Sequence, residues 1–424
     1  MTKGKPMSLM LRFSLPLLFT NVLQLVYTLA DAAVVGRVLG VTALGAVGAT
    51  SSLHWLVLSS VIGVTQGFST VFAQRMGAGD KEGLRKAFPT AVILAAALGI
   101  VIGGAGVLGG GAVLRLMETP PELQEDAAVY LRILLGGMPV TFAYNLLGGV
   151  LRGLGDSKTP LRAMILASVL NIALDIALAY PLGVAGVAIA TLLAQGFACV
   201  FCYIALQKTG MFTDTVLRWD GGYAKALLRL GLPAGFRNAV IEAGGLVVQR
   251  YVNLNGAEFV AGVAAAKRMY SLLTCAAGAV EAAVATFVAQ NFGVPDYERI
   301  KQGVAAGFRM MMVSAGVIIA ITLPLGRLIL ALMIDGEPER VKAVLDAGTA
   351  QLRTLVLGQP VLFMLFLYRS ALQGMGNAFV PMLSGFVESA VRVLSAVALT
   401  PVIGVWAVYL SDPLDWAAAL GLLA

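Results

Sequence analysis

The sequence repeatedly carries apolar runs that are long enough to cross a lipid bilayer. A membrane-spanning helix needs about 20 mostly apolar residues, because the hydrocarbon core is about 30 Å thick and a helix rises about 1.5 Å per residue. Only 12% of the 424 residues are charged, against about 25% in soluble proteins. The runs and the low charge together predict an all-α, polytopic membrane protein.

Charged residues and Pro or Gly breaks divide the chain into twelve predicted transmembrane helices. The last one is unusual, because Gly404 to Ala424 contains Asp412, Pro413 and Asp415. We expect this helix to begin near Pro413 and to be truncated, and an interfacial segment is the alternative. The predicted spans cover residues 13–37, 43–72, 88–114, 125–150, 160–181, 184–206, 230–254, 259–289, 304–334, 346–373, 379–401 and a short segment from about 404.

The basic residues predict which side of the membrane each loop faces. Lys and Arg gather in alternate loops, such as 75–86, 152–162 and 208–229, whereas the opposite loops hold more acids, including Glu122 and Glu337. By the positive-inside rule the basic side is the cytoplasm, so the N-terminus is predicted to be cytoplasmic. Because these cations lie in short loops rather than on one face, we expect no nucleic-acid partner despite the net charge of +7.

The two halves of the chain repeat each other in the same order. The sequence FAQRMG at 72–77 matches VAQNFG at 288–293, and GVLRGLGDSKTP at 149–160 matches SALQGMGNAFVP at 370–381. Each half holds six predicted spans, an even number, so both halves enter the membrane from the same side. They are therefore predicted to be parallel and related by an axis along the membrane normal, with a cavity between them, as in transporters.

This repeat sets the expected domain organisation. We predict an N-terminal six-helix bundle over residues 1–206, a cytoplasmic linker over 207–229 and a C-terminal six-helix bundle over 230–424. A duplicated scaffold without transport activity is the alternative interpretation.

An acid lies deep in the first predicted span. An ionised Asp at the centre of a membrane helix costs about 2.5–3.5 kcal/mol on insertion scales, so such groups are candidate functional residues. Helical spacing places Gln24, Tyr27 and Asp31 on one stripe of this span. Because burial disfavours the charged carboxylate, Asp31 is predicted to exchange protons within physiological gradients. A carboxylate that only holds helices together is the alternative.

The fifth predicted span carries a second acid of the same kind. Asp175 follows Asn171 by one helical turn, and Thr191 of the next span is placed to lie near them. If Asp175 lies close to Asp31, the two carboxyl groups will share protons and titrate in steps. A structural hydrogen bond between Asn171 and Asp175 is the competing interpretation.

The second half offers candidate cavity residues. Asn238, Glu242 and Gln249 share one stripe of the seventh span, which predicts a polar wall of a cavity, with Glu242 contacting cation or substrate. Glu281 of the eighth span shares a face with Lys267, but fourteen residues of helix separate them by about 21 Å, so Glu281 needs another partner. We include Glu281 among the candidate cavity residues.

Two further features are predicted to be structural or mechanical. Glu388 and Arg392 are spaced i,i+4 in the eleventh span, in the order that favours a local ion pair. Pro16 removes a backbone hydrogen bond within the first span and permits bending, so it is a candidate hinge. A proline in the first turn of that helix is the alternative.

Several classes of site are excluded by composition. Three cysteines and one histidine leave no disulfide framework and no metal site built from His and Cys clusters. We find no paired-His motif, no phosphate-binding glycine loop and no Ser/His/Asp set, and we therefore expect no enzymatic activity. No cofactor is predicted beyond a coupling ion.

The motifs together resemble the multidrug and toxic compound extrusion (MATE) family. They are LPLLFTNVLQLVYTLADAAVVGRVLGVTALGAVG, AQRMGAGDKEGLRKA, GVLRGLGDSKTP with NIALDIAL, and the second-half motifs GLPAGF and FVAQNFG. The resemblance extends from about Ser14 to Trp416 and is closest to the proton-coupled, DinF-like branch. It implies twelve helices in two six-helix bundles around a V-shaped cavity, and export of cationic, amphipathic compounds in exchange for protons or sodium.

The resemblance also implies roles for residues of the N-terminal half. Asp31, with Tyr27 one turn before it, matches the first-helix acid of the family, and Asn171 with Asp175 matches the fifth-helix polar pair. In proton-coupled members this cluster takes up the coupling ion, and the first helix bends at a proline placed like Pro16.

The C-terminal half matches the family less completely. Glu242 matches the seventh-helix acid that NorM-like members use for cation binding. However, residues 352–373 contain no acid, whereas that second site usually takes an Asp there. This departure weakens the sodium interpretation at the C-terminal half and leaves sodium open at Asp31 and Asp175.

These observations lead to one expected function and one rival. We expect a monomeric antiporter of the cytoplasmic (inner) membrane that exports organic cations and takes up protons, with sodium as the alternative ion and with membrane lipids around it. The rival is a lipid-linked oligosaccharide flippase of the same superfamily. Such a flippase needs a basic cavity for pyrophosphate, whereas the intramembrane charges identified here are mostly acidic.

Overall fold

The computed structural model describes residues 1–117, 119–212, 216–334 and 336–423, so residues 213–215 of the predicted linker and the final residue of the predicted second half lie outside it. Its described residues form thirteen helices and no strand, which confirms the predicted all-α class. The helices are α1 (Pro6–Val38), α2 (Val41–Gly77), α3 (Lys81–Leu116), α4 (Pro121–Gly136), α5 (Met138–Gly153), α6 (Lys158–Leu182), α7 (Val184–Lys208), α8 (Gly221–Asn253), α9 (Ala257–Gly293), α10 (Tyr297–Ala331), α11 (Pro338–Gly374), α12 (Phe379–Ile403) and α13 (Trp406–Leu423).

Most predicted spans coincide with one long helix. Within the described residues, nine helices are long and apolar enough to cross a membrane, and α4 with α5 form a tenth, bent crossing. Helices α8 and α13 complete the set of twelve, although both are too polar to be recognised as membrane spans from length and hydropathy alone. The predicted number of spans and their order therefore agree with the fold.

The fourth predicted span, residues 125–150, is broken rather than continuous. Helices α4 and α5 meet at Gly137 with a bend of 47°. Pro139 explains the break, because proline lacks an N–H and its ring clashes with the carbonyl group of the preceding turn. The matching proline of the second half, Pro360, lies inside the continuous helix α11.

The last helix begins earlier than its sequence predicted. Helix α13 starts at Trp406, not near Pro413, and passes through Pro413 without a break. The acids that argued against a helix here face a cation of the neighbouring helix α12, since Arg392 lies 3.3 Å from Asp412 and 2.5 Å from Asp415. Tertiary compensation therefore permits a polar stretch that hydropathy alone would place outside the membrane.

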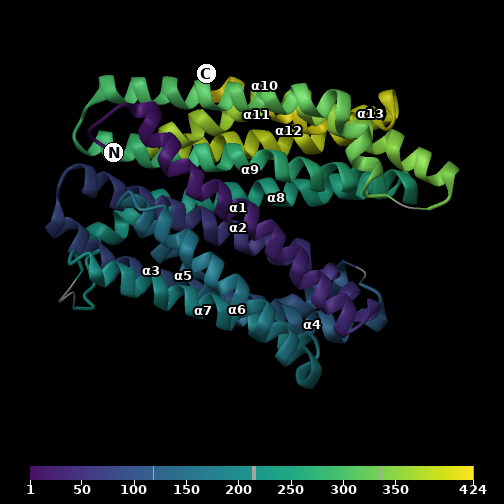
Figure 1. The fold of residues 1–424 in the computed structure, drawn as a ribbon, viewed down its shortest axis with the longest axis horizontal. Helices are drawn as coiled ribbons and strands as arrows, with labels where there is room; N and C mark the ends of the chain where they lie inside the picture. Colours follow the sequence, from purple (N-terminus) through teal and green to yellow (C-terminus); the bar gives the residue numbers. More distant parts are fainter. Residues whose placement is uncertain (118, 213–215, 335, 424) are drawn as a thin grey trace.

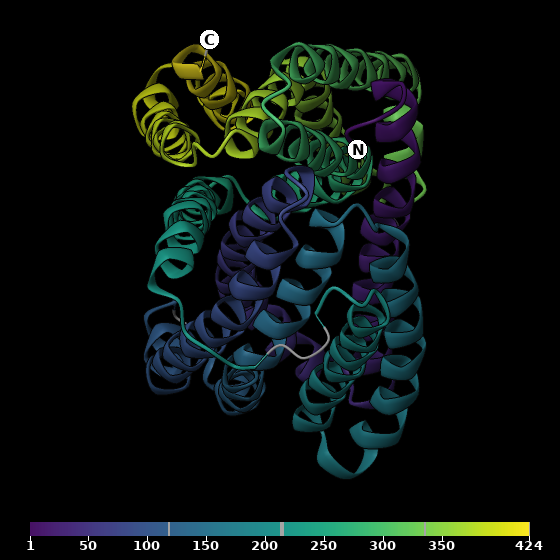
Figure 2. The ribbon, with the colours of Figure 1, turned by 90° about the vertical axis from the view of Figure 1, so that its left-hand side faces the viewer.

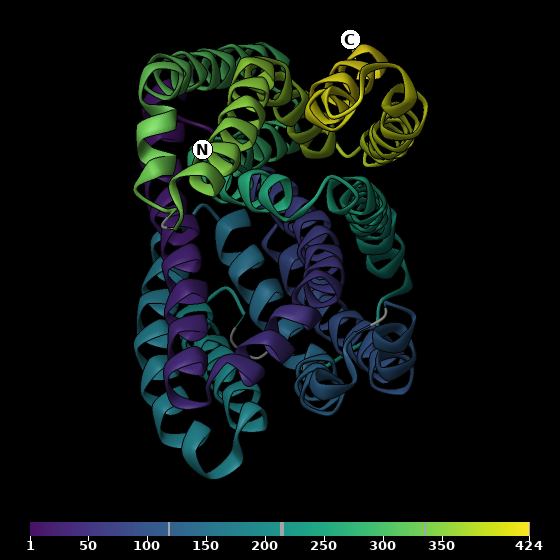
Figure 3. The ribbon, with the colours of Figure 1, turned by 90° about the vertical axis from the view of Figure 1, so that its right-hand side faces the viewer.

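The helices form two bundles that exchange their first helices in part (Figures 1 and 2). The N-terminal half of α1 packs in the second bundle, where Met10, Phe13 and Leu17 belong to its hydrophobic core. The N-terminal half of α8 packs in the first bundle through Leu227 and Leu230. Figure 3 shows α1, in purple, extending from one bundle to the other. The two crossing helices join the bundles.

The internal repeat is visible in the local structure of the turns. Asp80 caps α3 by accepting a hydrogen bond from Gly83 N, and Asp296 caps α10 in the same way from Arg299 N. The bond from Gly83 holds the pKa of Asp80 below its usual range. Gly183 and Gly404 occupy matching turns with φ of 59° and 58°, a conformation that glycine adopts without strain.

The ends of α2 and α9 cross in a reciprocal contact, which we call the α2–α9 crossing. A Cβ atom at Gly77 would overlap the backbone carbonyl of Gln290, and one at Gly293 would overlap that of Gln74. The Gln74 side chain donates a hydrogen bond of 2.9 Å to the carbonyl of Gly374 in the second half. The Gln290 side chain donates one of 2.8 Å to the carbonyl of Gly153 in the first half. The crossing closes one end of the space between the bundles.

Candidate functional site

The acids of the first and fifth predicted spans lie together in the structure. Helices α1 and α6 pack side by side, and the carboxyl groups of Asp31 and Asp175 lie close enough to interact with each other. Asp175 is fully buried, while Asp31 is half-buried. We call these two residues the acid pair. Asp31 and Asp175 therefore lie close together, which is the condition under which they are expected to titrate in steps.

The other predicted members of this cluster surround the acid pair. Asn171 is fully buried and donates a hydrogen bond of 3.3 Å to Asp175 Oδ1. Tyr27 lies one turn before Asp31 on α1, and its hydroxyl is 3.4 Å from Thr191 Oγ1 on α7. The predicted neighbours of the acids thus come from three helices that meet at one place.

The geometry of the acid pair determines its chemistry. Two ionised carboxylates in contact repel each other, and a hydrogen bond between them requires one proton. One oxygen of each carboxyl group and Asn171 Oδ1 have no hydrogen-bond partner among the described residues. Two carboxyl groups placed in this way can hold a proton between them, and their free oxygens are of the type that binds hard cations.

Gln24 is not part of this cluster. Its side chain is exposed on α1, and only its backbone carbonyl is engaged, accepting a hydrogen bond from Thr28. Helical spacing placed Gln24 on the stripe of Asp31 but did not determine which residues of the stripe are covered by α6 and α7. Tyr130 of α4, which was not identified from the sequence, does lie within electrostatic range of the acid pair.

The polar stripe of α8 faces the other half of the molecule. Asn238 donates a hydrogen bond of 2.8 Å to the carbonyl of Ser59 on α2, and Glu242 accepts one of 3.0 Å from Trp55 Nε1 on α2. The expectation of a wall facing a cavity within the second half therefore needs correction for these two residues. The exchange of α8 between the bundles is the reason, because it places this stripe against α2.

Gln249 does not join that contact. Its side chain donates a hydrogen bond of 2.9 Å to Asn253 one turn later on the same helix. Trp55, in contrast, was missed, because a single tryptophan in an apolar span carries no signal that it will meet an acid from the other half of the chain.

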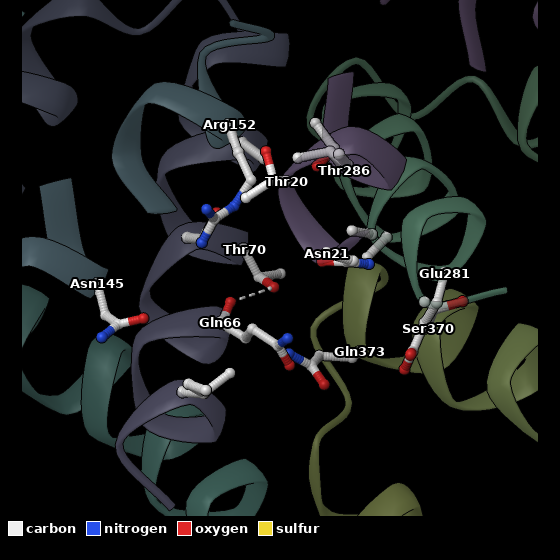
Figure 4. A pocket seen from close by; sticks show the side chains of 17 residues that line it. Thr20, Asn21, Gln66, Thr70, Asn145, Arg152, Glu281, Thr286, Ser370 and Gln373 are labelled. Atoms are coloured by element: carbon white, nitrogen blue, oxygen red, sulfur yellow. Dashed lines mark hydrogen bonds between the residues drawn. The ribbon is translucent and has the colours of Figure 1, made fainter. Parts of the chain in front are cut away.

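Glu281 lies where it was predicted, on the wall of a cavity. The cavity has a volume of about 220 Å³ and lies between the two bundles, next to the α2–α9 crossing. Its polar lining includes residues of α1, α2, α5, α9 and α11, and Figure 4 shows their side chains converging on it. We call this space the polar cavity. The residues that carry its polar groups are Thr20, Asn21, Gln66, Ser69, Thr70, Asn145, Arg152, Glu281, Thr286, Ser370 and Gln373.

The predicted ion pair of α12 belongs to a larger buried network. Arg392 and Glu388 lie 3.1 Å apart, and Glu388 also pairs with Arg369 of α11 at 2.6 Å. Asp412 and Asp415 of α13 complete the network around Arg392. Arg369 and Asp415 were missed as members, although the rule that flags intramembrane charges applied equally to Arg369.

Pro16 lies in the interior of α1, ten residues after the helix begins at Pro6. The alternative that it occupies the first turn is therefore wrong. Its carbonyl accepts a hydrogen bond of 2.9 Å from Thr20 Oγ1, and the helix continues through it to Val38. The position fits a candidate hinge between the part of α1 in the second bundle and the part that carries Asp31.

The part of the chain that the structure describes holds no group of three or more His, Cys, Asp or Glu side chains that could bind a metal ion. The acid pair has two carboxyl groups, and its described neighbours add the amide of Asn171 and the phenols of Tyr27 and Tyr130. The site's ionisable chemistry is therefore that of two coupled carboxyl groups.

Comparison with known proteins gives consistent results. The MatE family model matches residues 16–177 and 233–397, which are corresponding parts of the two halves. The chain is 34% identical to a probable multidrug resistance protein, YpnP, of Bacillus subtilis, over 70% of this chain and 68% of that protein. It is 26% identical to a probable multidrug resistance protein, NorM, of Thermotoga maritima, over 89% and 82%.

A solved structure of a MOP superfamily transporter from Pyrococcus furiosus has the same fold. It superimposes with a TM-score of 0.90 at 24% identity, covering 99% of this chain and 94% of that one. The match extends across both bundles.

Proposed function

We propose that this chain, which belongs to the MatE family of multidrug and toxic compound extrusion transporters, exports organic cations in exchange for protons. Relatives over most of its length are named multidrug resistance proteins. Such export makes it a transporter rather than an enzyme. Sodium is the alternative coupling ion.

The acid pair is the observation that carries this proposal. The carboxyl groups of Asp31 and Asp175 lie together inside the membrane-spanning bundle, where an unneutralised charge is costly. A group that must be neutralised can be neutralised by a proton or by a cation, but not fully by both. The pair therefore provides a physical basis for exchange of one for the other.

The exchange follows from competition within an alternating cavity. A drug cation is attracted by carboxylates and by aromatic faces such as Tyr27. When the cavity opens outward, protonation of Asp31 and Asp175 removes that attraction and releases the cation. When it opens to the cytoplasm, proton loss restores the attraction. The two ligands thus shift the same equilibrium in opposite directions.

The remaining expectations belong to the same proposal. The transporter lies in the cytoplasmic membrane as a monomer, with its N-terminus and the α2–α9 crossing on the cytoplasmic side. Arg75 and Lys81 beside that crossing agree with the positive-inside rule. In this orientation the closed end of the polar cavity faces the cytoplasm.

The first test is proton release from proteoliposomes on addition of a fluorescent organic cation, with and without sodium. We expect the parent protein to give cation-stimulated proton release without sodium and Asp31→Asn to abolish it, because an amide cannot exchange protons. Asp346→Asn is the matched control, since Asp346 is an exposed carboxylate paired only with Arg327.

Each outcome decides between the alternatives. Flux that depends on sodium would reassign the coupling ion. Retained flux in folded Asp31→Asn protein would remove Asp31 from the mechanism. No flux with any organic cation would favour the flippase, which a lipid-flipping assay with lipid-linked oligosaccharide would then measure.

A further inference from the structure

The polar cavity carries opposite charges on opposite walls. Arg152 of α5 enters it from the first bundle and Glu281 of α9 from the second, and Figure 4 shows the two side chains on different sides of the space. Neither residue takes part in the acid pair or in the ion-pair network around Arg392. Their role is not accounted for by proton exchange at Asp31.

Arg152, which the sequence places at the start of a basic loop, lies within the last turn of α5 and points back into the protein. Helical side chains point toward the helix N-terminus, which directs Arg152 away from the end of α5 and over Gly148. A Cβ atom at Gly148 would lie 3.3 Å from the guanidinium, so a glycine there makes room for it. The guanidinium of Arg152 forms no ion pair or hydrogen bond with any residue that the structure describes.

The nearest titratable groups give Arg152 no counter-charge. They are Tyr144 and Cys202, which are neutral at physiological pH. A guanidinium has five N–H donors in a planar fork that matches carboxylate and phosphate oxygens. An unpaired guanidinium inside a membrane protein is costly, which makes it a candidate for binding an anionic group.

Glu281 is the complementary group. Its carboxyl group makes no direct hydrogen bond or ion pair with any described residue, although Arg237 and Arg369 act on it electrostatically. Both arginines have other contacts, Arg237 with Asn238 and Arg369 with Glu388. The carboxyl oxygens of Glu281 therefore remain free to accept hydrogen bonds from an ammonium group in the cavity.

Between these charges the cavity is lined by side chains that both donate and accept hydrogen bonds. Gln66 and Gln373 lie on facing helices, α2 and α11, and Asn145 and Thr286 add an amide and a hydroxyl. The volume of about 220 Å³ is smaller than the 300–1,000 Å³ typical of drug sites. In this conformation the cavity therefore fits a small molecule, or the charged end of a larger one.

We propose that the polar cavity binds bipolar organic ions, with an anionic group held by the Arg152 guanidinium and a cationic group held by the Glu281 carboxylate. The proposal rests on the transport function and deepens it, because it assigns a binding site and the two charges that this site would recognise. The site lies directly beside the α2–α9 crossing, so a ligand bound there would contact both bundles at the end that must open.

A competing use of the same residues is mutual pairing. If the bundles move closer together, Arg152 and Glu281 could neutralise each other and act as a gate without any ligand. The two uses differ in one measurable respect, since only a ligand site distinguishes molecules by whether they carry both charges.

The test measures equilibrium binding to the purified full-length protein by isothermal titration, without an ion gradient. Three small probes share one skeleton: 4-(aminomethyl)benzoate carries both charges, its methyl ester carries only the cation, and 4-methylbenzoate carries only the anion. We expect the parent to bind the zwitterion about tenfold more tightly than the ester, the effect of one charge-assisted hydrogen bond.

Two substitutions assign the charges. Arg152→Gln should reduce the preference for the zwitterion over the ester to near unity, and Glu281→Gln should weaken the zwitterion and the ester while sparing 4-methylbenzoate. Arg218→Gln and Glu339→Gln are matched controls, because both side chains are exposed and neither lines the polar cavity. Melting curves in detergent verify that each variant is folded.

Equal binding of the zwitterion and the ester by the parent would overturn the proposal, as would an unchanged preference in folded Arg152→Gln. Either result would leave mutual pairing of Arg152 and Glu281, as a gate, as the role of the two charges. Because the assay uses no gradient, it can fail while Asp31-dependent export succeeds. Equally, binding can succeed in Asp31→Asn protein that does not transport, so the two proposals fail separately.

Discussion

At the scale of single residues, the charges inside the described part of this protein differ in what surrounds them. The two carboxyl groups of the acid pair lie together, Arg392 is surrounded by carboxylates, and Arg152 and Glu281 border a cavity. Desolvating an ion inside a protein costs several kcal/mol, so each arrangement must supply a comparable favourable interaction. The charges that a proton or a ligand can still neutralise, at the acid pair and in the polar cavity, are the ones to which we assign function.

The Arg392 network predicts a large loss of stability from a single substitution. Arg392→Met should lower the free energy of unfolding by about 3–5 kcal/mol, because it leaves Asp412 and Asp415 buried without their cation. The measurement is the midpoint of thermal unfolding in detergent. Arg327→Met is the control, since its pair with Asp346 is exposed and such pairs contribute about 0–1 kcal/mol. Equal midpoints for the two variants would contradict the structural role of the network.

At the scale of helices, the repeat places equivalent groups on both sides of the α2–α9 crossing. Gln74 reaches from the first half to the second, and Gln290 reaches from the second half to the first, so the closed end is joined by two matching hydrogen bonds. Opening this end requires both to break. Their combined strength therefore contributes to the balance between the closed and open forms.

This balance predicts the effect of removing the two amides. Gln74→Leu and Gln290→Leu should each make opening easier by about 1 kcal/mol, about fivefold in the opening equilibrium, because leucine cannot donate to Gly374 or Gly153. Hydrogen–deuterium exchange at the ends of α2 and α9 measures the opening. The exposed Gln302→Leu on α10 is the control. Exchange that matches the parent in the double variant would show that these bonds do not hold the end closed.

At the scale of the whole molecule, the partial exchange of α1 and α8 makes the two bundles mechanically dependent on each other. The part of α1 that carries Asp31 packs with α6, while the part before Pro16 belongs to the second core. A movement of one bundle relative to the other therefore acts on α1 near its proline. This connection provides a route by which bundle movement and protonation at Asp31 influence each other.

The orientation of the whole molecule can be measured by cysteine labelling in intact cells. In a variant whose three natural cysteines are replaced by alanine, Glu122→Cys should react with a membrane-impermeant maleimide. Lys158→Cys should react only after the cells are permeabilised, because the positive-inside rule places it in the cytoplasm. Both residues are exposed, which makes their reactivities comparable. The reverse pattern would place the N-terminus and the α2–α9 crossing outside.

The sequence by itself determined the class of fold, the approximate bounds of the helices, the repeat and the acids of the first bundle. These properties follow from hydropathy and from helical periodicity, which are local, and Asp31, Asn171 and Asp175 were found because a charge in an apolar run stands out. The break at Gly137 was not predicted, although Pro139 is visible in the sequence. A proline alone does not determine a break, since the matching Pro360 lies within a continuous helix.

Only the tertiary structure decided which faces meet. Periodicity places Gln24 and Asp31 on one stripe, but the position of α6 decides that Asp31 is paired and Gln24 is exposed. The start of α13 at Trp406 depends on Arg392 of another helix, and the charges of the polar cavity come from two bundles. These features require contacts between residues far apart in the chain, and the free energy of such contacts is set by packing rather than by local sequence.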